Sequence, residues 1–263
     1  MKPSLTIIKV GGAVVEDEAQ LTQLLRDFTA IQGPKILVHG GGRRATKIAE
    51  RLGIETKMVD GRRITDADML EVVTMVYGGL VNKNVVARLQ ALGCDAIGLT
   101  GADANILLSQ KRPLKMVNGE PVDYGFVGDV KQPSGSKIAH FIDADLIPVI
   151  APLTHDGQGH MLNTNADTMA SETAKAMATV GYDVTLIYAF EKPGVLRDAD
   201  DDNSVIATIN HADFETYKAD GTISGGMLPK IENALAAIDA GVKRVIITKA
   251  TAIDGQHGTV ITK

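Results

Sequence analysis

Residues 4–12 read SLTIIKVGG, an almost continuously apolar run that ends in a lysine and two glycines. Such a run predicts a strand buried on both faces, as in a parallel sheet. A similar run, KILVHGGG, follows at residues 35–42, after a segment whose apolar residues recur at helical spacing. A strand, a helix and a second strand predict a parallel βαβ unit with both glycine clusters at one edge of the sheet.

The same alternation continues along the chain. Further strands are predicted at 96–99, 146–151, 183–188 and 242–248, and helices at 16–32, 43–52, 65–92, 136–144, 165–180 and 227–240. Residues 105–131 differ, because their runs are shorter and Asn118-Gly119 is typical of a hairpin turn. We predict a three-layer αβα sandwich with a mainly parallel open sheet and a small β-rich excursion near 105–131. Two lobes, 1–175 and 176–263, would share that one sheet.

Composition narrows the class of protein. The 27 Lys and Arg against 32 Asp and Glu give a net charge of −5, which argues against nucleic-acid binding. The single cysteine, Cys94, excludes a disulfide framework and favours a reduced cytoplasmic setting. The first residues lack the apolar stretch of a signal peptide, and no run approaches the roughly 18 residues of a membrane helix. We expect a cytoplasmic protein that acts on a small molecule, without a nucleic-acid or membrane partner.

The two glycine clusters predict an anion site, because backbone N–H groups can approach a ligand closely where no Cβ intervenes. Tight turns alone would explain either cluster, but two on neighbouring strands favour a shared ligand. The pattern Gly40-x-Gly42-x-x-Ala45 also matches a dinucleotide fingerprint. A nicotinamide dehydrogenase is therefore a distant alternative, since that fingerprint usually lies on the first βα unit.

Two lysines and an aspartate stand out for their positions. Lys9 ends a buried strand, and Lys230 lies in SGGMLPK (residues 224–230), where glycines and a proline predict the free N–H groups of a helix N-terminus. Asn165 is a natural N-cap, which puts Asp167 in the first turn of a helix. Each residue also has a simpler explanation: Lys230 could be a solvated lysine on a helix, and the helix dipole alone would favour the charge of Asp167. The functional interpretation is that Asp167 orients both lysines.

Five motifs together resemble those of the amino acid kinase family, in the family's order and over nearly the whole chain. They are KVGG (9–12), HGGG (39–42), GRRITDAD (61–68), MLNTNAD (161–167) and GGMLPKI (225–231). The resemblance is strongest to members that phosphorylate the γ-carboxylate of N-acetyl-L-glutamate in arginine biosynthesis. It implies ATP and Mg²⁺, an acylated glutamate bound by the first lobe, and ATP bound by the second.

The alternatives that stay open are a kinase for N-succinyl-L-glutamate, another carboxylate or carbamate kinase of this fold, and a non-catalytic nucleotide sensor. Hexameric members of the family carry an extra N-terminal helix, whereas the first strand here is predicted to begin by about residue 4. We therefore expect a homodimer.

The resemblance also implies roles for individual residues. Lys9 and Lys230 would stabilise the transferred phosphoryl group, and Asp167 would organise both lysines. The implied substrate-binding residues are Gly41, Gly42, Arg63 and Asn163, and the implied nucleotide-binding residues are Gly11, Gly12, Glu191, Gly194, Leu196, Ser224 and Gly226. No protein ligand to a metal is implied. The segment YAFEKPGVL (188–196) departs from the family's usual pattern at Phe190 and Glu191.

Overall fold

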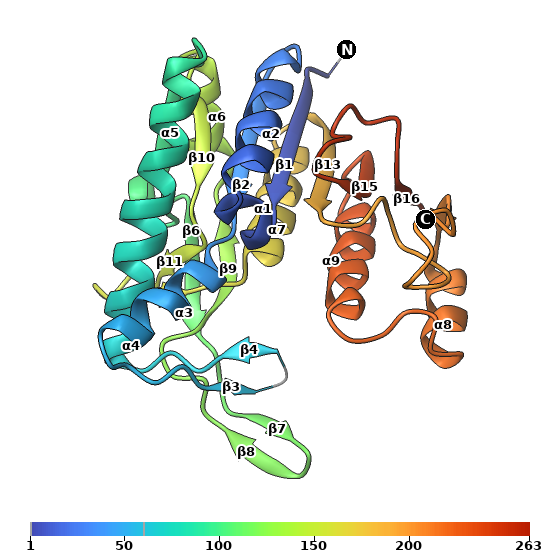
Figure 1. Ribbon diagram of the computed structural model, residues 1–263. Coiled ribbons are helices and arrows are strands. Elements are labelled where there is room, and N and C mark those ends of the chain that lie inside the picture. The colour runs from blue at the N-terminus through green and yellow to red at the C-terminus, as the bar shows by residue number, and fades with distance from the viewer. Residues whose placement is uncertain (1, 60) are drawn as a thin grey trace.

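The computed structural model describes residues 2–59 and 61–263, and it contains the predicted sandwich (Figure 1). Its main sheet has eight strands, all parallel to their neighbours except for the antiparallel pair β15–β16. In spatial order they are β14 (Thr208–Ile209), β16 (Thr259–Ile261), β15 (Arg244–Lys249), β13 (Asp183–Phe190), β1 (Ser4–Val10), β2 (Lys35–His39), β10 (Ile147–Ile150) and β5 (Ala96–Leu99). Strands from before and after residue 175 belong to this one sheet. The predicted mainly parallel α/β fold is confirmed.

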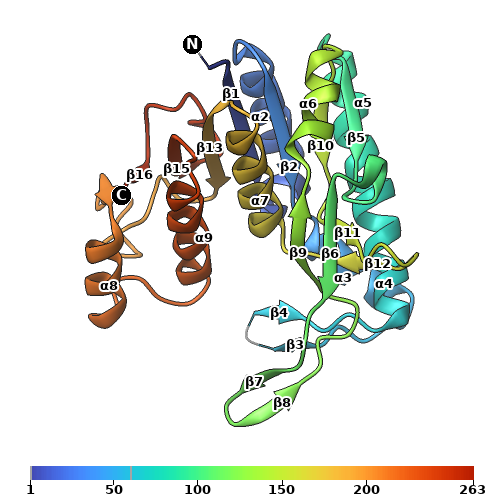
Figure 2. The same cartoon turned by 180° about the vertical axis from the view of Figure 1, so that it is seen from behind.

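Helices cover both faces of this sheet, as the two opposite views show (Figures 1 and 2). On one face lie α1 (Gly12–Glu16), α2 (Glu18–Ala30) and α5 (Asn82–Ala91), and on the other lie α6 (Gly135–Asp143), α7 (Ala166–Thr179), α8 (His211–Ala219) and α9 (Met227–Asp239). Leu24 and Phe28 of α2 pack on Ile8 of β1 in one buried cluster. Met169 of α7 and Ile231 of α9 belong to the cluster on the opposite face. Burial on both faces is the reason that the strands are continuously apolar.

The first two strand–helix turns meet at the carboxyl edge of the sheet. The backbone nitrogen of Gly40 donates to the oxygen of Val10 at 3.0 Å, and that of Gly11 donates to the oxygen of Ala189 at 3.1 Å. A Cβ placed on Gly40 would lie 3.0 Å from the backbone nitrogen of Gly12, tighter than side chains normally pack. Glycine is therefore required at Gly40 by this close approach of two backbones.

The helical boundaries differ from the predictions in two places. The helix predicted over residues 16–32 is two helices, because the side chain of Asp17 accepts hydrogen bonds from the backbone nitrogens of Ala19 and Gln20 and caps α2. The predicted helix start at Thr65 is also wrong. Asp66 is the N-cap of α4 (Ala67–Val73), with its carboxylate accepting from the nitrogen of Met69 at 2.9 Å.

Residues 74–81 form a π-helix, η1 (Thr74–Val81), between α4 and α5. The single helix predicted over residues 65–92 thus consists of three consecutive segments, α4, η1 and α5. Wider turns of this kind are uncommon and occur most often at functional sites. Here η1 carries Tyr77 toward the second glycine cluster, since the side chain of Tyr77 lies against Gly41.

The predicted β-rich excursion near 105–131 forms one hairpin and two strands of a second sheet, which two strands from residues 153–163 complete. The strand order of that sheet is β12 (Met161–Asn163), β11 (Leu153–His155), β6 (Leu107–Lys111) and β9 (Gly128–Pro133). The hairpin of β7 (Lys115–Val117) and β8 (Glu120–Val122) turns at Asn118 and Gly119, whose φ angles of 51° and 86° match the predicted turn. A hairpin of β3 (Met58–Val59) and β4 (Arg62–Arg63) lies beside it, and both project below the carboxyl end of β1 (Figures 1 and 2).

The remaining short elements are α3 (Gly42–Arg51), which begins at the second glycine cluster, and the 3₁₀ turn η2 (Asp103–Asn105). The sequence patterns did not predict β14, α8 or β16. The two strands contain only two and three residues, which is too short for a period to emerge. They extend the sheet beyond β15 all the same.

Candidate active site

Asp167 joins the two predicted lysines at the carboxyl edge of the main sheet. The Nζ atom of Lys9 lies 2.8 Å from Oδ1 of Asp167, and the Nζ atom of Lys230 lies 3.0 Å from Oδ2. Lys9 comes from the end of β1, Asp167 from the first turn of α7 and Lys230 from the first turn of α9. The structure therefore brings together three side chains that come from distant parts of the chain.

The helix N-terminus of α7 fixes the position of that carboxylate. Asn165 is the N-cap, and its Oδ1 atom accepts from the backbone nitrogens of Asp167 at 2.8 Å and Thr168 at 3.1 Å. This is the capping role that the sequence predicts for Asn165. The cap and the helix dipole both favour a negative charge in the first turn, so Asp167 is held as a carboxylate where the lysines converge.

The protonation states follow from burial and charge. Burial alone would raise the pKa of Asp167, but Lys9 and Lys230 outweigh it and bring the pKa to about 2. Burial lowers the pKa of Lys230, and the positive charge of Lys9 lowers it further, while Asp167 acts in the opposite direction. One carboxylate shared by two ammonium groups leaves an excess positive charge beside the glycine clusters, which suits a site for anions.

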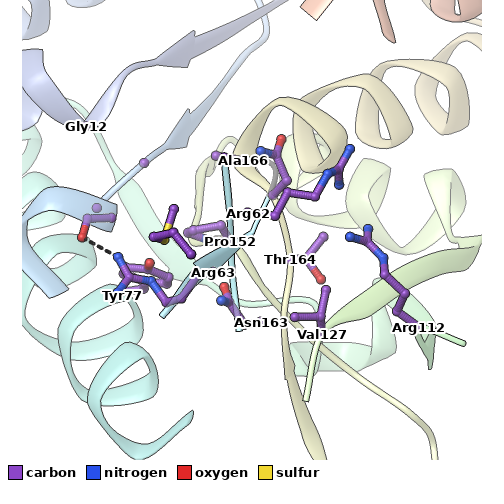
Figure 3. Close-up of a pocket in the computed structure, with 16 residues that line it drawn as sticks. Gly12, Arg62, Arg63, Tyr77, Arg112, Val127, Pro152, Asn163, Thr164 and Ala166 are labelled. Carbon is purple, nitrogen blue, oxygen red and sulfur yellow. Dashed lines mark hydrogen bonds between the residues drawn. The ribbon is translucent and has the colours of Figure 1, made fainter. Parts of the chain in front are cut away.

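A cavity of about 230 Å³ lies between the second glycine cluster, the β3–β4 hairpin and β12 (Figure 3). Among the predicted substrate-binding residues, Gly41, Gly42, Arg63 and Asn163 all line it, and so does Gly12. The wall also includes Arg62, Tyr77 and Arg112, which the sequence analysis did not assign to the site. Arg112 comes from the β-rich excursion, and no local pattern in the sequence indicates that it reaches this cavity.

Arg63 connects the β3–β4 hairpin to the second glycine cluster. Its Nη2 atom donates to the carbonyl oxygen of Gly42 and to Oγ1 of Thr46, both at 2.9 Å, and Figure 3 marks the bond to Gly42 with a dashed line. Its Nη1 atom donates to Oγ1 of Thr56 at 3.2 Å. These neutral oxygen acceptors fix the guanidinium at the cavity wall. They do not neutralise its positive charge.

Arg112, unlike Arg63, is paired with a carboxylate. Arg112 makes a two-pronged contact with Asp129, with its Nε and Nη2 atoms at 3.0 and 2.6 Å from Oδ1. Asn163 also lines this cavity, and its Nδ2 atom donates to Oγ1 of Thr65 at 3.0 Å. Thr65 is fully buried, and its hydroxyl accepts this bond and orients the side-chain amide of Asn163.

A second cavity of about 270 Å³ lies on the other side of the glycine clusters. Gly11, Gly12 and Glu191, three of the predicted nucleotide-binding residues, line it together with Phe190. Gly12 and Gly42 line both cavities, so the two spaces meet at the glycine clusters. This is the arrangement that two negatively charged reactants would need in order to meet at a common set of N–H groups.

The remaining predicted nucleotide-binding residues line neither cavity. Gly194 packs beside Val205 and Thr259, and Leu196 bridges to Val205 in the loop after β13. Ser224 and Gly226 lie at the start of α9, where Gly226 is the N-cap and the carbonyl of Ser224 accepts from the nitrogen of Met227. None of these four residues is therefore placed by either cavity.

The described residues contain no cluster of three or more His, Cys, Asp or Glu side chains that could hold a metal ion. The one acidic group between the lysines, Asp167, has each of its oxygens within 3.0 Å of an ammonium. These residues therefore do not form a metal site of their own. In the part of the chain that the structure describes, no helix is long and apolar enough to span a bilayer.

The model of the amino acid kinase family matches residues 4–249, and this chain belongs to that family. A protein of Bacteroides fragilis named acetylglutamate kinase is 63% identical over 263 residues, which are 100% of this chain and 98% of that protein. A protein of the same name from Methanopyrus kandleri is 38% identical over 257 residues, 98% of this chain and 100% of that protein.

Solved structures agree on the fold. The smu.665 protein of Streptococcus mutans superposes with a TM-score of 0.80 at 28% identity, covering 98% of each chain. A carbamate kinase of Giardia superposes with a TM-score of 0.70 at 16% identity, covering 99% of each chain. At that lower identity the similarity concerns the fold alone.

Proposed function

We propose that this protein is an N-acyl-L-glutamate 5-kinase, which transfers a phosphoryl group from ATP to the γ-carboxylate of N-acetyl-L-glutamate in arginine biosynthesis. The names of full-length relatives at up to 64% identity support this substrate. The observation that carries the proposal is the pairing of Lys9 and Lys230 with Asp167, beside glycine clusters shared by two cavities.

The chemistry requires positive charge more than it requires a base. A γ-carboxylate has an ordinary pKa near 4.3 and is already a nucleophile at neutral pH. One of its oxygens forms a bond to the γ-phosphorus of ATP while the bond from that phosphorus to the bridging oxygen breaks, and ADP leaves with the electron pair. The two reactants repel each other, so fixed ammonium groups and backbone N–H groups must offset that repulsion.

We assign the cavity walled by Arg63 and Asn163 to the acylated glutamate, with both residues on the α-carboxylate side. The cavity beside Gly11 and Glu191 would take the phosphates of ATP, whose nucleoside would extend over the loops at Gly194, Leu196, Ser224 and Gly226. Lys9 and Lys230 would then stand at the junction and contact the transferred phosphoryl group. In this proposal the lobe of residues 1–175 binds the acceptor and the lobe of residues 176–263 binds the donor.

Magnesium would enter this site with the nucleotide. Since the described residues provide no cluster of metal ligands, we propose that Mg²⁺ is bound by the phosphates of ATP and solvent. When bound it would neutralise part of the phosphate charge. The lysines and N–H groups of the protein would neutralise the charge on the transferred group.

A second substrate is favoured by a specific observation. Arg62 lines the acceptor cavity in addition to Arg63, whereas Arg112, which also lines it, is already paired with Asp129. Arg62 is therefore one guanidinium group more than the α-carboxylate of N-acetylglutamate needs. An N-succinyl group would bring one more carboxylate, which guanidinium groups recognise in a fork-like geometry. N-succinyl-L-glutamate is therefore the alternative acceptor.

A coupled ADP-release assay with N-acetylglutamate, N-succinylglutamate, glutamate and aspartate in parallel tests the proposal. Turnover of an acylated glutamate, with little for free glutamate or aspartate, is the expected result. The ratio of the two acylated substrates chooses between the acceptors. If neither is turned over, the proposed kinase activity is wrong.

We further propose a cytoplasmic homodimer. The single cysteine, which is buried and free, supports the cytoplasmic setting. The dimer is supported by Met75 and Leu80 of η1, whose large apolar side chains are 54% and 41% exposed. Apolar side chains that stand out of the surface in this way often mark a contact between chains.

A further inference from the structure

Two aromatic rings lie against the ammonium group of Lys230. Its Nζ atom is 5.3 Å from the ring centroid of Tyr188 and 5.7 Å from that of Phe190. Both distances are within the range of about 6 Å over which a ring face attracts a cation. The same ammonium lies 3.0 Å from the carboxylate of Asp167. Lys230 is therefore held by one carboxylate and two rings, and its residue is only 8% exposed.

The register of the main sheet explains this arrangement. Tyr188 and Phe190 are two residues apart on β13, so their side chains lie on the same face. Tyr188 is in register with Lys9 on the neighbouring β1, which places the first lysine beside the same rings. The face that they share is the one covered by α7 and α9, the two helices that provide Asp167 and Lys230.

The two rings differ in what else they contact. Tyr188 is fully buried, and its hydroxyl donates to the backbone oxygen of Asp167 at 3.2 Å. Phe190 is only partly buried, and it lines the cavity beside Gly12 and Glu191. One ring thus supports the turn that carries Asp167, while the other lies against Lys230 and also lines the cavity that we assign to ATP.

The charged groups around Lys230 disfavour the protonated, charged form of its side chain. Lys9 faces it from β1, and among residues 2–59 and 61–263 only Asp167, from α7, forms an ion pair with either lysine. Lys249 of β15 is in register with Phe190 and adds a third cation at this end of the sheet. At the outer end of the cavity Arg43 and Glu191 pair with each other at 3.5 Å. Burial and the repulsion from Lys9 both lower the pKa of Lys230.

We propose that Phe190, together with Tyr188, is a positioning residue that keeps the Lys230 ammonium charged and in place for phosphoryl transfer. The ring faces supply attraction where water is excluded and where a second carboxylate would repel the incoming phosphates. The proposal rests on the proposed kinase function, because it gives the rings a role in the protonation of a lysine that acts on the phosphoryl group.

Phe190→Leu tests the proposal, because it keeps an apolar side chain and removes the ring face. We expect the alkaline limb of the kcat–pH profile to move to lower pH by roughly half a unit to one unit, the effect of losing one partly desolvated cation–π contact. Phe190→Tyr retains the ring and should restore the position of the limb. Phe214→Leu is the matched control, since the ring centroid of Phe214 lies 5.6 Å from the Nζ atom of Lys218 on α8, away from the site. That control should leave the limb unchanged.

A second measurement does not depend on turnover. With lysine labelled at Cε with ¹³C, the resonance of Lys230, assigned through Lys230→Arg, reports loss of its proton directly. Phe190→Leu should shift that titration to lower pH by the same amount as the kinetic limb, and Phe190→Tyr should not.

The outcomes separate the two proposals. If Phe190→Leu raises only the KM for ATP and leaves both titrations unchanged, Phe190 is merely a wall of the cavity and the inference is wrong. If the wild-type protein turns over no acylated glutamate, the proposed function fails. The labelled-lysine titration would still decide whether the rings hold the charge of Lys230.

Discussion

At the scale of single residues, the site depends on charges that are fixed before any ligand binds. Lys9 and Lys230 lie within 3.0 Å of the same carboxylate and are each only 8% exposed. Groups fixed in this way need little reorganisation when charge develops on a transferred phosphoryl group. Their contribution should therefore appear in the rate of the chemical step more than in the binding of the substrates.

Replacing Lys9 or Lys230 with alanine should lower kcat by roughly 10²–10³ and change the KM values by much smaller factors. Steady-state kinetics with ATP and the acylated glutamate measure both quantities. Lys243→Ala is the control, because Lys243 pairs at the surface with Asp183 at 2.8 Å, away from the site. A variant of Lys9 or Lys230 in which only KM changes would contradict the assigned role.

His39 makes the stability of the protein depend on pH. It is fully buried, with Nδ1 2.9 Å from the oxygen of Gly40 and Nε2 3.1 Å from Nδ2 of Asn82. Burial lowers its pKa from 6.5 to about 4. The unfolded chain therefore takes up a proton below about pH 6.5, while the folded chain does so only near pH 4. The contribution of neutral His39 to the free energy of unfolding is fully present above pH 6.5 and is lost as the pH falls toward 4.

Urea unfolding at pH 7 and pH 4.5 checks this sign. His39→Gln removes the titrating ring, so the free energy of unfolding of this variant should fall less between the two pH values than that of the wild type, by roughly 2–3 kcal/mol. His140→Gln, on α6, should behave like the wild type. An equal loss of stability in His39→Gln and the wild type would contradict the buried neutral state of His39.

At the scale of elements, helix N-termini place the functional groups. Asp167 and Lys230 both lie in the first turn of a helix, and α3 starts at the second glycine cluster. Free N–H groups at such termini favour anions, which explains why three helices begin around one site. The cap of α7 is the most specific of these features, because Asn165 accepts from the first turn that holds Asp167.

Asn165→Ala should cost about 1 kcal/mol of stability through the lost cap, and it should also lower kcat because Asp167 loses its fixed turn. Asn210→Ala provides a matched comparison, since Asn210 caps α8 through the nitrogen of Asp213 at 2.9 Å, away from the site. We expect the same loss of stability there with kcat unchanged. Equal kinetic effects from the two variants would show that the cap of α7 has no special link to the reaction.

At the scale of the whole molecule, one continuous sheet connects the two halves of the chain. β1 lies between β2 of the first half and β13 of the second, so Lys9, near the end of β1, has a neighbouring strand from each half. The cores on either face of the sheet include residues from both halves. This continuity holds Lys9 and Lys230 in one geometry although they are 221 positions apart in the sequence.

The oligomeric state is the property to test at this scale. Light scattering coupled to size-exclusion chromatography should give twice the mass of one chain across a range of concentrations. Met75→Glu, which places a charge on the exposed apolar surface of η1, should shift the equilibrium toward the single chain. A wild-type protein that runs as a monomer or as a hexamer would contradict the proposed homodimer.

The sequence by itself determined six of the eight strands of the main sheet, most of the helices and the residue types proposed for the site. Apolar runs such as Ser4–Val10 and Lys35–His39 matched the observed strands at both ends, because burial on both faces leaves a continuous signal. The Asn165 cap was also readable, since a cap is made within four residues. Boundaries near Asp17 and Asp66 were wrong, because neighbouring residues could serve equally well as caps.

Only the tertiary structure decided which of these groups meet. Arg112 reaches the cavity beside Arg63 from the β-rich excursion, and the rings of Tyr188 and Phe190 lie against Lys230 on another element. Such contacts depend on sheet register and on the packing of helices over strands that are far apart in the chain. Local periodicity contains no information about them, because it reports which side of an element is buried and not what that side packs against.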